Sequence, residues 1–226
     1  FMWLINSTIG RKVVMSVTGV ALILFLTFHM SMNVVALFSG DAYNMICGAL
    51  GAHWYAVVAT LGLAALAVLH IVYAFWLTMQ NRAARGSERY AVVAKPAGVE
   101  WASQNMLVLG IIVLVGLLLH FWNFWYNMMF AELVGFEGVC APADGYGWIQ
   151  QTFSNPVFVV LYIVWLVALW FPLTHGFWSA MQTFGWNGKV WFNRWKVIGQ
   201  VYSTLLILGF LVVVVVFAAK NLCGCC

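Results

Sequence analysis

Residues 99–129 read VEWASQNMLVLGIIVLVGLLLHFWNFWYNMM, and this stretch decides the fold. Between Met106 and His120 it contains no Asp, Glu, Lys or Arg. An α-helix rises 1.5 Å per residue, so about 20 apolar residues cross the roughly 30 Å hydrocarbon core of a bilayer. The stretch therefore predicts a transmembrane helix.

Four further stretches share this character, and the chain as a whole is 65% apolar and only 7% charged, against about 25% charged in a typical globular domain. The first is too long for a signal peptide, so we expect it to be a retained span. No room is left for a separate soluble domain. The sequence predicts one all-α domain over residues 1–226, a transmembrane bundle of five helices surrounded by membrane lipid. The four other spans are expected at about 12–38, 53–80, 155–183 and 195–220.

Basic residues predict the orientation of the bundle. Nine of the ten Lys and Arg fall on one side of the predicted spans, and only Lys220 lies on the other. By the positive-inside rule that side is cytoplasmic, which places the N-terminus inside and the C-terminus outside. The net charge of +4 is thus a topology signal, and no nucleic-acid partner is expected. The nine residues are Arg11, Lys12, Arg82, Arg85, Arg89, Lys95, Lys189, Arg194 and Lys196.

Five cysteines lie on or near the predicted outer side, where an oxidising compartment would allow disulfides. Cys47 and Cys140 fall in the two outer loops, and a disulfide between them and two free thiols both remain open. Cys223, Cys225 and Cys226 cluster at the terminus, a weak indication of a metal site. Pairing between molecules, or disorder, explains that cluster better.

Histidines are the only candidates for chemistry inside the spans. His29, His70, His120 and His175 lie one on each of the first four predicted helices, whose interiors contain no Asp, Glu, Lys or Arg. An ionisable group within a membrane is costly and is a functional-site candidate by default. The alternative is four unrelated histidines, each bonded to a neighbouring carbonyl or hydroxyl.

Two of these histidines are predicted to share an outer level. His29 comes 12 residues before Asp41, and His120 comes 12 before Glu132, on two helices that both run outward. At 1.5 Å per residue, both rings lie roughly 10–15 Å below the outer surface.

The other two are predicted to share an inner level. His70 comes 12 residues before Arg82, and His175 comes 14 before Lys189, on helices that run inward. Two pairs at two depths match the need of two haems, each held by histidines on opposite faces of the macrocycle. The sequence therefore predicts two haem b groups, with an offset on the order of 10–15 Å.

Glycines support the same arrangement. Gly19 and Gly110 each lie ten residues before an outer histidine, about 15 Å inward of it and near the level of the other haem. Glycine at these positions permits a haem to approach the helix backbone closely. Ordinary packing between membrane helices also uses small residues.

Polar residues on the histidine faces are candidate ligand contacts. Ser179 and Gln182 follow His175 towards the cytoplasm and are candidates for inner-haem propionates. Asn33, Asn123 and Asn127 lie outward of the outer pair, where an amide can bond a quinone carbonyl, a propionate or a nearby backbone group. These residues extend the predicted cofactor site beyond the iron.

Several fragments together resemble the di-haem cytochrome b subunit of succinate dehydrogenase and fumarate reductase complexes, in its five-helix form. The likeness covers nearly the whole chain, and the combination is specific where no single fragment is. The fragments are 7–12 (STIGRK), 15–19 (MSVTG) before His29, 101–103 (WAS) and Gly110 before His120, and 175–185 (HGFWSAMQTFG).

The resemblance implies a place in the bacterial inner (cytoplasmic) membrane and two partners on the cytoplasmic face. These are a flavoprotein with covalent FAD and an iron-sulfur subunit, for which the basic inner loops offer a docking surface. Electrons would pass between the clusters, the inner haem, the outer haem and a quinone, usually menaquinone, and no fumarate or succinate site lies on this chain. His29, His70, His120 and His175 match the ligand positions, and Ser16 matches a position that can bond an inner-haem propionate. We expect fumarate reduction by menaquinol; a dimer of complexes is left open.

Two departures from the family pattern concern protons. Some relatives carry a glutamate two residues before the fourth ligand, where this chain has Leu173, so a proton path of that type is doubtful. Some also use a glutamate near the start of the second helix at the quinone site, where the nearby titratable groups here are Asp41 and His53. His53 can exchange protons near neutral pH and is the leading quinone-site candidate.

Two other functions remain as alternatives. A cytochrome b anchor of a hydrogenase or formate dehydrogenase uses the same chemistry, but its usual histidine distribution differs. A transporter with a histidine-lined pathway would favour broken helices and buried carboxylates, for which Pro172 alone is thin support.

Overall fold

The computed structural model describes residues 7–85 and 104–222, and within these ranges every regular element is a helix. Five helical segments are long and apolar enough to cross a membrane, which confirms the predicted all-α fold class and multi-pass character. The long helices are α2 (Thr8–Val35), α4 (Trp54–Arg85), α6 (Met106–His120) with its continuation η1 (Phe121–Phe130) and α7 (Ala131–Val134), α9 (Pro156–Thr183) and α10 (Lys189–Leu222).

The ends of the spans differ by a few residues from those expected. The fourth span agrees best, because Asn155 caps α9 through a bond from the Val157 amide (2.9 Å) and Pro156 occupies the first turn. The third extends to Val134 instead of 129, and its predicted start lies outside the described residues. The fifth begins at Lys189 instead of 195, because its basic and aromatic first turns are also helical.

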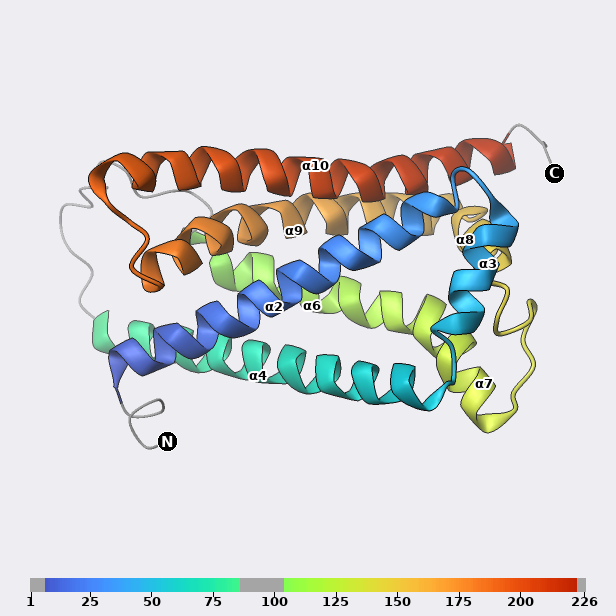
Figure 1. The fold of residues 1–226 in the computed structure, drawn as a ribbon, viewed down its shortest axis with the longest axis horizontal. Coiled ribbons are helices and arrows are strands. Elements are labelled where there is room, and N and C mark those ends of the chain that lie inside the picture. The colour runs from blue at the N-terminus through green and yellow to red at the C-terminus, as the bar shows by residue number, and fades with distance from the viewer. Residues whose placement is uncertain (1–6, 86–103, 223–226) are drawn as a thin grey trace.

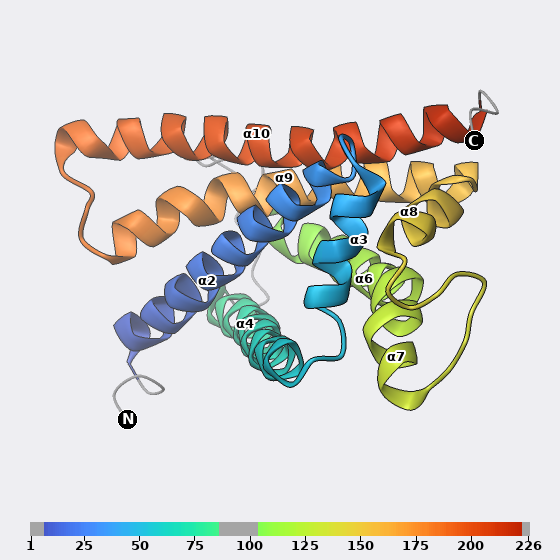
Figure 2. The same cartoon turned by 45° about the vertical axis from the view of Figure 1, so that its right-hand side comes forward.

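The bundle is centred on the antiparallel pair α9 and α10, which lie side by side in Figures 1 and 2. Helix α2 crosses this pair and contacts both helices, α4 packs against α2, and α6 packs against α9. The largest fully buried side chains in the described residues, Phe217, Leu206 and Ser203, all belong to α10. The helices α2, α6 and α9 therefore surround the region where the predicted outer histidines lie.

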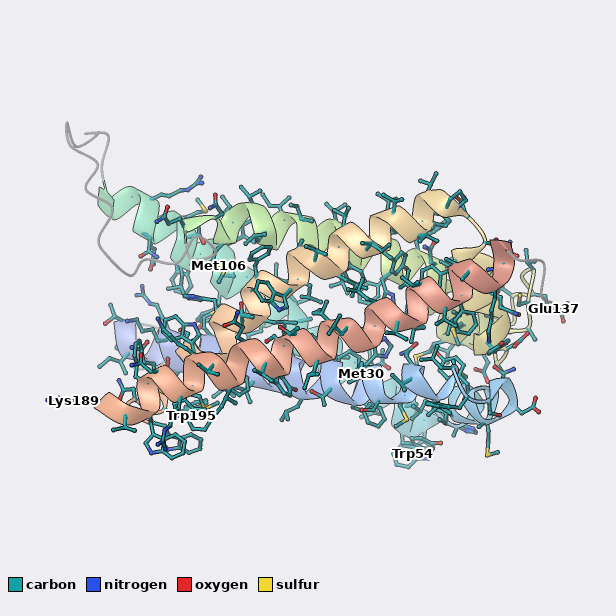
Figure 3. All side chains as sticks on the ribbon, turned by 90° about the horizontal axis from the view of Figure 1, so that it is seen from above. Met30, Trp54, Met106, Glu137, Lys189 and Trp195 are labelled. Carbon is teal, nitrogen blue, oxygen red and sulfur yellow. The ribbon has the colours of Figure 1, made fainter. Side chains whose placement is uncertain are left out.

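Opposite charges occupy opposite ends of the bundle. Figure 3 shows Lys189 at one end and Glu137 at the other. At the Lys189 end, the Arg11 guanidinium lies over the Trp76 ring, 4.9 Å from its centroid, and donates to the side chain of Gln80. At the Glu137 end, Lys220 Nζ donates to the Tyr146 hydroxyl at 3.3 Å. The uneven distribution of basic and acidic residues along the sequence thus corresponds to a charge difference between the two ends of the bundle.

Two short helices, α3 (Gly40–Ala49) and α8 (Gly145–Phe153), cover the acidic end, where only loops were expected. Asn44 joins them, because its Nδ2 donates to Asp144 Oδ1 (2.7 Å) and its Oδ1 accepts from the Tyr146 amide (2.8 Å). Asp144 also caps α8 by accepting from the Gly147 amide at 3.0 Å. We call this pair of helices the α3–α8 cap.

A π-helix follows His120 directly, over Phe121–Phe130. Its wider turn is visible in the backbone at its end, where the Ala131 amide donates to the carbonyl of Tyr126, five residues earlier. Such segments are rare and occur frequently at functional sites. The regular α-helical spacing assumed for Asn123 and Asn127 therefore does not apply beyond His120.

Candidate functional site

The structure brings His29 of α2 and His120 of α6 together in the middle of the bundle. Their ring centroids are 5.8 Å apart, and the ring planes are nearly perpendicular at 81°. The two residues are 91 positions apart in sequence, and the depth count from the acidic residues placed them at one level. We call them the outer histidine pair.

Aromatic rings enclose this pair on several sides. Phe25 stacks on His29 at 5.4 Å, and Phe210 of α10 lies 5.7 Å from the same ring. Around His120 the ring centroids of Phe124, Tyr162 and Trp165 lie at 5.2, 6.2 and 5.6 Å, respectively. The imidazoles thus occupy an apolar, largely aromatic environment.

The two rings differ in their hydrogen bonds. Asn33 Nδ2 donates to the His29 carbonyl at 2.8 Å and lies 3.4 Å from His29 Nδ1, while Asn33 Oδ1 accepts from Tyr43 of the α3–α8 cap at 3.1 Å. In contrast, Nδ1 of His120 is buried and has no hydrogen-bond partner. A buried polar atom without a partner is costly in a folded protein and requires an explanation.

His70 lies at a second level, against α2. Its Nδ1 is 3.0 Å from Thr18 Oγ1, and a Cβ added to Gly19 would lie 3.4 Å from His70 Cε1. Thr18 precedes His29 by 11 residues on the same helix, which corresponds to roughly 16 Å. Gly19 therefore lies close to the inner histidine, at the level where the sequence placed it.

Helical rise places His175 of α9 near the same inner level. It follows Trp165, which contacts His120, by ten residues, or about 15 Å along the helix. Its ring packs against Trp178 with centroids 4.9 Å apart. His70 thus has Thr18 as a neighbour and His175 has Trp178. The structure thus assembles the outer pair, whereas the common inner level of His70 and His175 follows from helical rise.

The outer pair fits a metal held between two imidazoles. Bonds between a metal and an imidazole nitrogen are about 2 Å long, and a ring separation of 5.8 Å is of the size that two such bonds need. Residues 7–85 and 104–222 contain no cluster of three or more His, Cys, Asp or Glu that could hold a metal ion, so paired donors are the available set.

The other predicted haem contacts are placed less specifically. Ser16 is buried two residues before Thr18, on the inner half of α2. Gly110 faces open space, because an added Cβ would meet no atom within 4 Å. Ser179 is half-buried and Gln182 is exposed, both on the last turns of α9. Only Gly19 among the predicted small residues contacts a histidine.

The quinone candidates are not gathered into one site. Asn33 bonds to Tyr43, as described above, and the buried Asn123 donates to the Tyr162 hydroxyl at 3.4 Å. Asn127 is bonded to backbone within its own helix, and Asp41 is exposed in the first turn of α3. His53 is exposed just before α4, where its ring stacks on Tyr55 at 5.5 Å. Its position at the acidic end of the bundle agrees with the predicted one.

Cys47 and Cys140 are both free thiols in the structure. Cys47 lies in the α3–α8 cap, where burial raises the pKa of its thiol despite a hydrogen bond with Tyr43. Burial also raises the pKa of Tyr43 well above its usual range. The three terminal cysteines lie outside the described residues.

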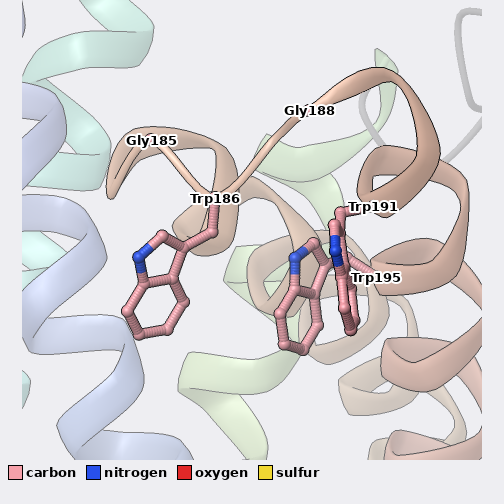
Figure 4. Close-up of a pocket in the computed structure, with 5 residues that line it drawn as sticks. All are labelled: Gly185, Trp186, Gly188, Trp191 and Trp195. Carbon is pink, nitrogen blue, oxygen red and sulfur yellow. The ribbon is translucent and has the colours of Figure 1, made fainter.

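A pocket of about 300 Å³ opens at the basic end, in the turn between α9 and α10. Figure 4 shows its lining of two glycines and three indoles, with Trp191 and Trp195 in ring contact at 5.4 Å. No histidine or carboxylate lines it. The pocket therefore offers an aromatic membrane-interface surface instead of redox or acid–base groups. Its residues are Gly185, Trp186, Gly188, Trp191 and Trp195.

Sequence reasoning missed the side chains that enclose the outer pair. Tyr162 and Trp165 lie three residues apart on one face of α9, and Gly116 lies four before His120 on α6. Those spacings are the signal that was available in the sequence. Nothing in the sequence, however, indicates which face of α9 meets α6.

Comparison of the chain with models of protein families, with curated proteins and with solved structures finds no match.

Proposed function

We propose that this protein is the membrane anchor of a quinone-linked oxidoreductase, and that it holds two b-type haems. The observation that carries the proposal is the outer histidine pair, with ring centroids 5.8 Å apart inside an aromatic enclosure. The resemblance of the sequence to the di-haem cytochrome b subunits of succinate dehydrogenases and fumarate reductases favours the same function. The pair His70 and His175, at the inner level, would hold the second haem.

The chain's own residues would bind and orient the cofactors. When bound, the haems supply one-electron redox centres at two depths, which lie about 15 Å apart along the helices. The four imidazoles would hold the two haem irons, and rings such as Phe25, Phe124 and Trp165 would keep water away from the outer site. His53, exposed at the acidic end, is our candidate for proton exchange with a quinone.

The remaining parts of the proposal concern partners and direction. An iron-sulfur subunit and a flavoprotein would dock at the basic end, and menaquinol would be oxidised near the outer haem to support fumarate reduction. The membrane would be the bacterial cytoplasmic membrane, with the basic end inside. Affinity purification from a mild detergent, followed by mass spectrometry and flavin fluorescence, tests the partners. Purification of the chain with a transport or hydrogenase complex instead would contradict this part.

The transporter alternative gains no support from the spans. Helix α9 continues through Pro172 without a break, and the buried polar residues of the described spans are uncharged. The chain offers no buried carboxylate along a pathway within its described residues.

Haem content is the direct test of the proposal. Protein solubilised from membranes should show the reduced α-band of a b-type cytochrome and two haems per chain. A folded, assembled preparation without haem would eliminate the di-haem function, whereas one haem per chain would contradict the inner pair.

A further inference from the structure

The strongest unassigned feature near the outer pair is the contact between Gly116 of α6 and Trp165 of α9. An added Cβ at Gly116 would fall far inside the van der Waals distance of three indole atoms, Cδ1, Cγ and Nε1 of Trp165. Gly116 is itself buried. The indole therefore lies directly on the backbone of α6, which only glycine permits here.

Two further contacts fix this indole in place. Its Nε1 donates to the Val113 carbonyl at 3.0 Å, and its ring lies 5.6 Å from the His120 ring at an angle of 33°. Val113, Gly116 and His120 share one face of α6, because they are spaced by three and four residues. The indole thus lies along that face, held at one end by the carbonyl and lying against the imidazole at the other.

His120 needs such a support because Nδ1 of its ring is buried without a hydrogen-bond partner. Ligand histidines are ordinarily oriented by a hydrogen bond from the nitrogen that does not bind the metal. Here aromatic contacts take that place, and the Tyr162 ring also contacts the indole, with centroids 5.7 Å apart.

We propose that Trp165 is a positioning residue that fixes the orientation of the His120 ring, and that Gly116 is required so that the indole can reach it. This inference rests on the proposed function of His120 as a haem ligand. It predicts that the angle between the two outer imidazole planes depends on a residue that touches neither iron nor quinone.

The test uses the EPR signal of the outer haem, because the largest g value of a low-spin bis-histidine haem depends on the angle between its imidazole planes. We expect Gly116→Ala to shift this g value, since the new methyl group lifts the indole from α6. Trp165→Ala should also shift it, by removing the support. The double variant Gly116→Ala/Trp165→Ala should match Trp165→Ala alone, because no indole remains for the methyl group to displace.

Gly62→Ala is the matched control. It adds the same methyl group to a membrane helix at a site where no atom lies within 4 Å, and it should leave both haem signals unchanged. If Gly116→Ala does not fold, Trp165→Phe removes the bond to Val113 and keeps an aromatic ring; it should still shift the outer signal, but less than Trp165→Ala.

The outcomes separate this inference from the proposed function. Two haems with unshifted outer signals in the folded Gly116→Ala or Trp165 variants would overturn the positioning role alone. A shift in Gly116→Ala that persists undiminished in the Trp165→Ala background would do the same, because it would act through another contact. Absence of haem from the unaltered protein would overturn both.

Discussion

At the scale of single residues, His53 is the candidate for proton exchange at the quinone site. Its side chain is exposed and stacks on Tyr55. We expect His53→Ala to slow menaquinol oxidation several-fold with both haems retained, because the imidazole is our candidate for proton exchange with the quinone. Steady-state oxidation of a soluble menaquinol analogue measures the effect. Glu137→Gln, a change of another exposed residue at the same end, serves as the control. Unchanged kinetics in His53→Ala would return the residue to a surface role.

Cys47 makes the α3–α8 cap sensitive to alkaline pH. Its thiol pKa is raised by burial, so the folded protein keeps the thiol neutral at a pH where the unfolded chain, with a pKa of about 8.5, ionises. The stabilisation is therefore fully present below that pKa and is lost as the pH rises through the higher folded value. We predict that alkylation of Cys47 at pH 8.5, followed by peptide mass spectrometry, is several-fold slower in the folded protein than in denaturant. Equal rates would contradict this environment.

At the scale of elements, the long helices were predictable and the short ones were not. Uninterrupted apolar stretches determine a span almost alone, because a bilayer requires all backbone polar groups to be bonded internally. Helices α3 and α8 are short and mixed in composition, and they depend on contacts such as Asn44 with Asp144, 100 residues apart. The π-helix after His120 has no sequence signature of this kind. It changes which residues share a face with His120.

The α3–α8 cap should depend on Asp144. Its side chain caps α8 and accepts from Asn44, so Asp144→Ala removes both bonds. We expect the free energy of unfolding in detergent to fall by about 0.5–2 kcal/mol, the usual range for a lost N-cap. Denaturant titration followed by circular dichroism measures it. Glu137→Ala, at an exposed position, is the control and should change the free energy of unfolding by less than about 0.5 kcal/mol. If Asp144→Ala also changed it by less than about 0.5 kcal/mol, the two bonds of Asp144 would not stabilise the fold.

At the scale of the whole molecule, charge separates the two ends of the bundle and predicts its orientation. Lys189 and Glu137 lie at opposite ends, and the cap lies with Glu137. We expect a membrane-impermeant thiol reagent, added to intact cells, to label Cys140 in a variant that retains only this cysteine. If Cys140 were labelled only after the cells were opened, the acidic end would face the cytoplasm, opposite to the predicted orientation.

The candidate site shows how far sequence alone can reach. Counting residues from each histidine to the next charged residue predicted that His29 and His120 lie at one level, and in the structure their rings are in contact. The same count placed His70 and His175 at a common inner depth, but it could not supply their neighbours, Thr18 and Trp178. Depth is encoded along each helix, whereas the rotation and packing of one helix against another depend on all the side chains between them.

The central claim is that four histidines form two pairs, and haem content in double variants tests it most directly. His29→Ala/His120→Ala removes both members of the outer pair and should leave one haem per chain. His29→Ala/His70→Ala removes one member of each pair and should leave none. Equal haem content in these two double variants, with both proteins folded, would contradict the pairing and the function proposed from it.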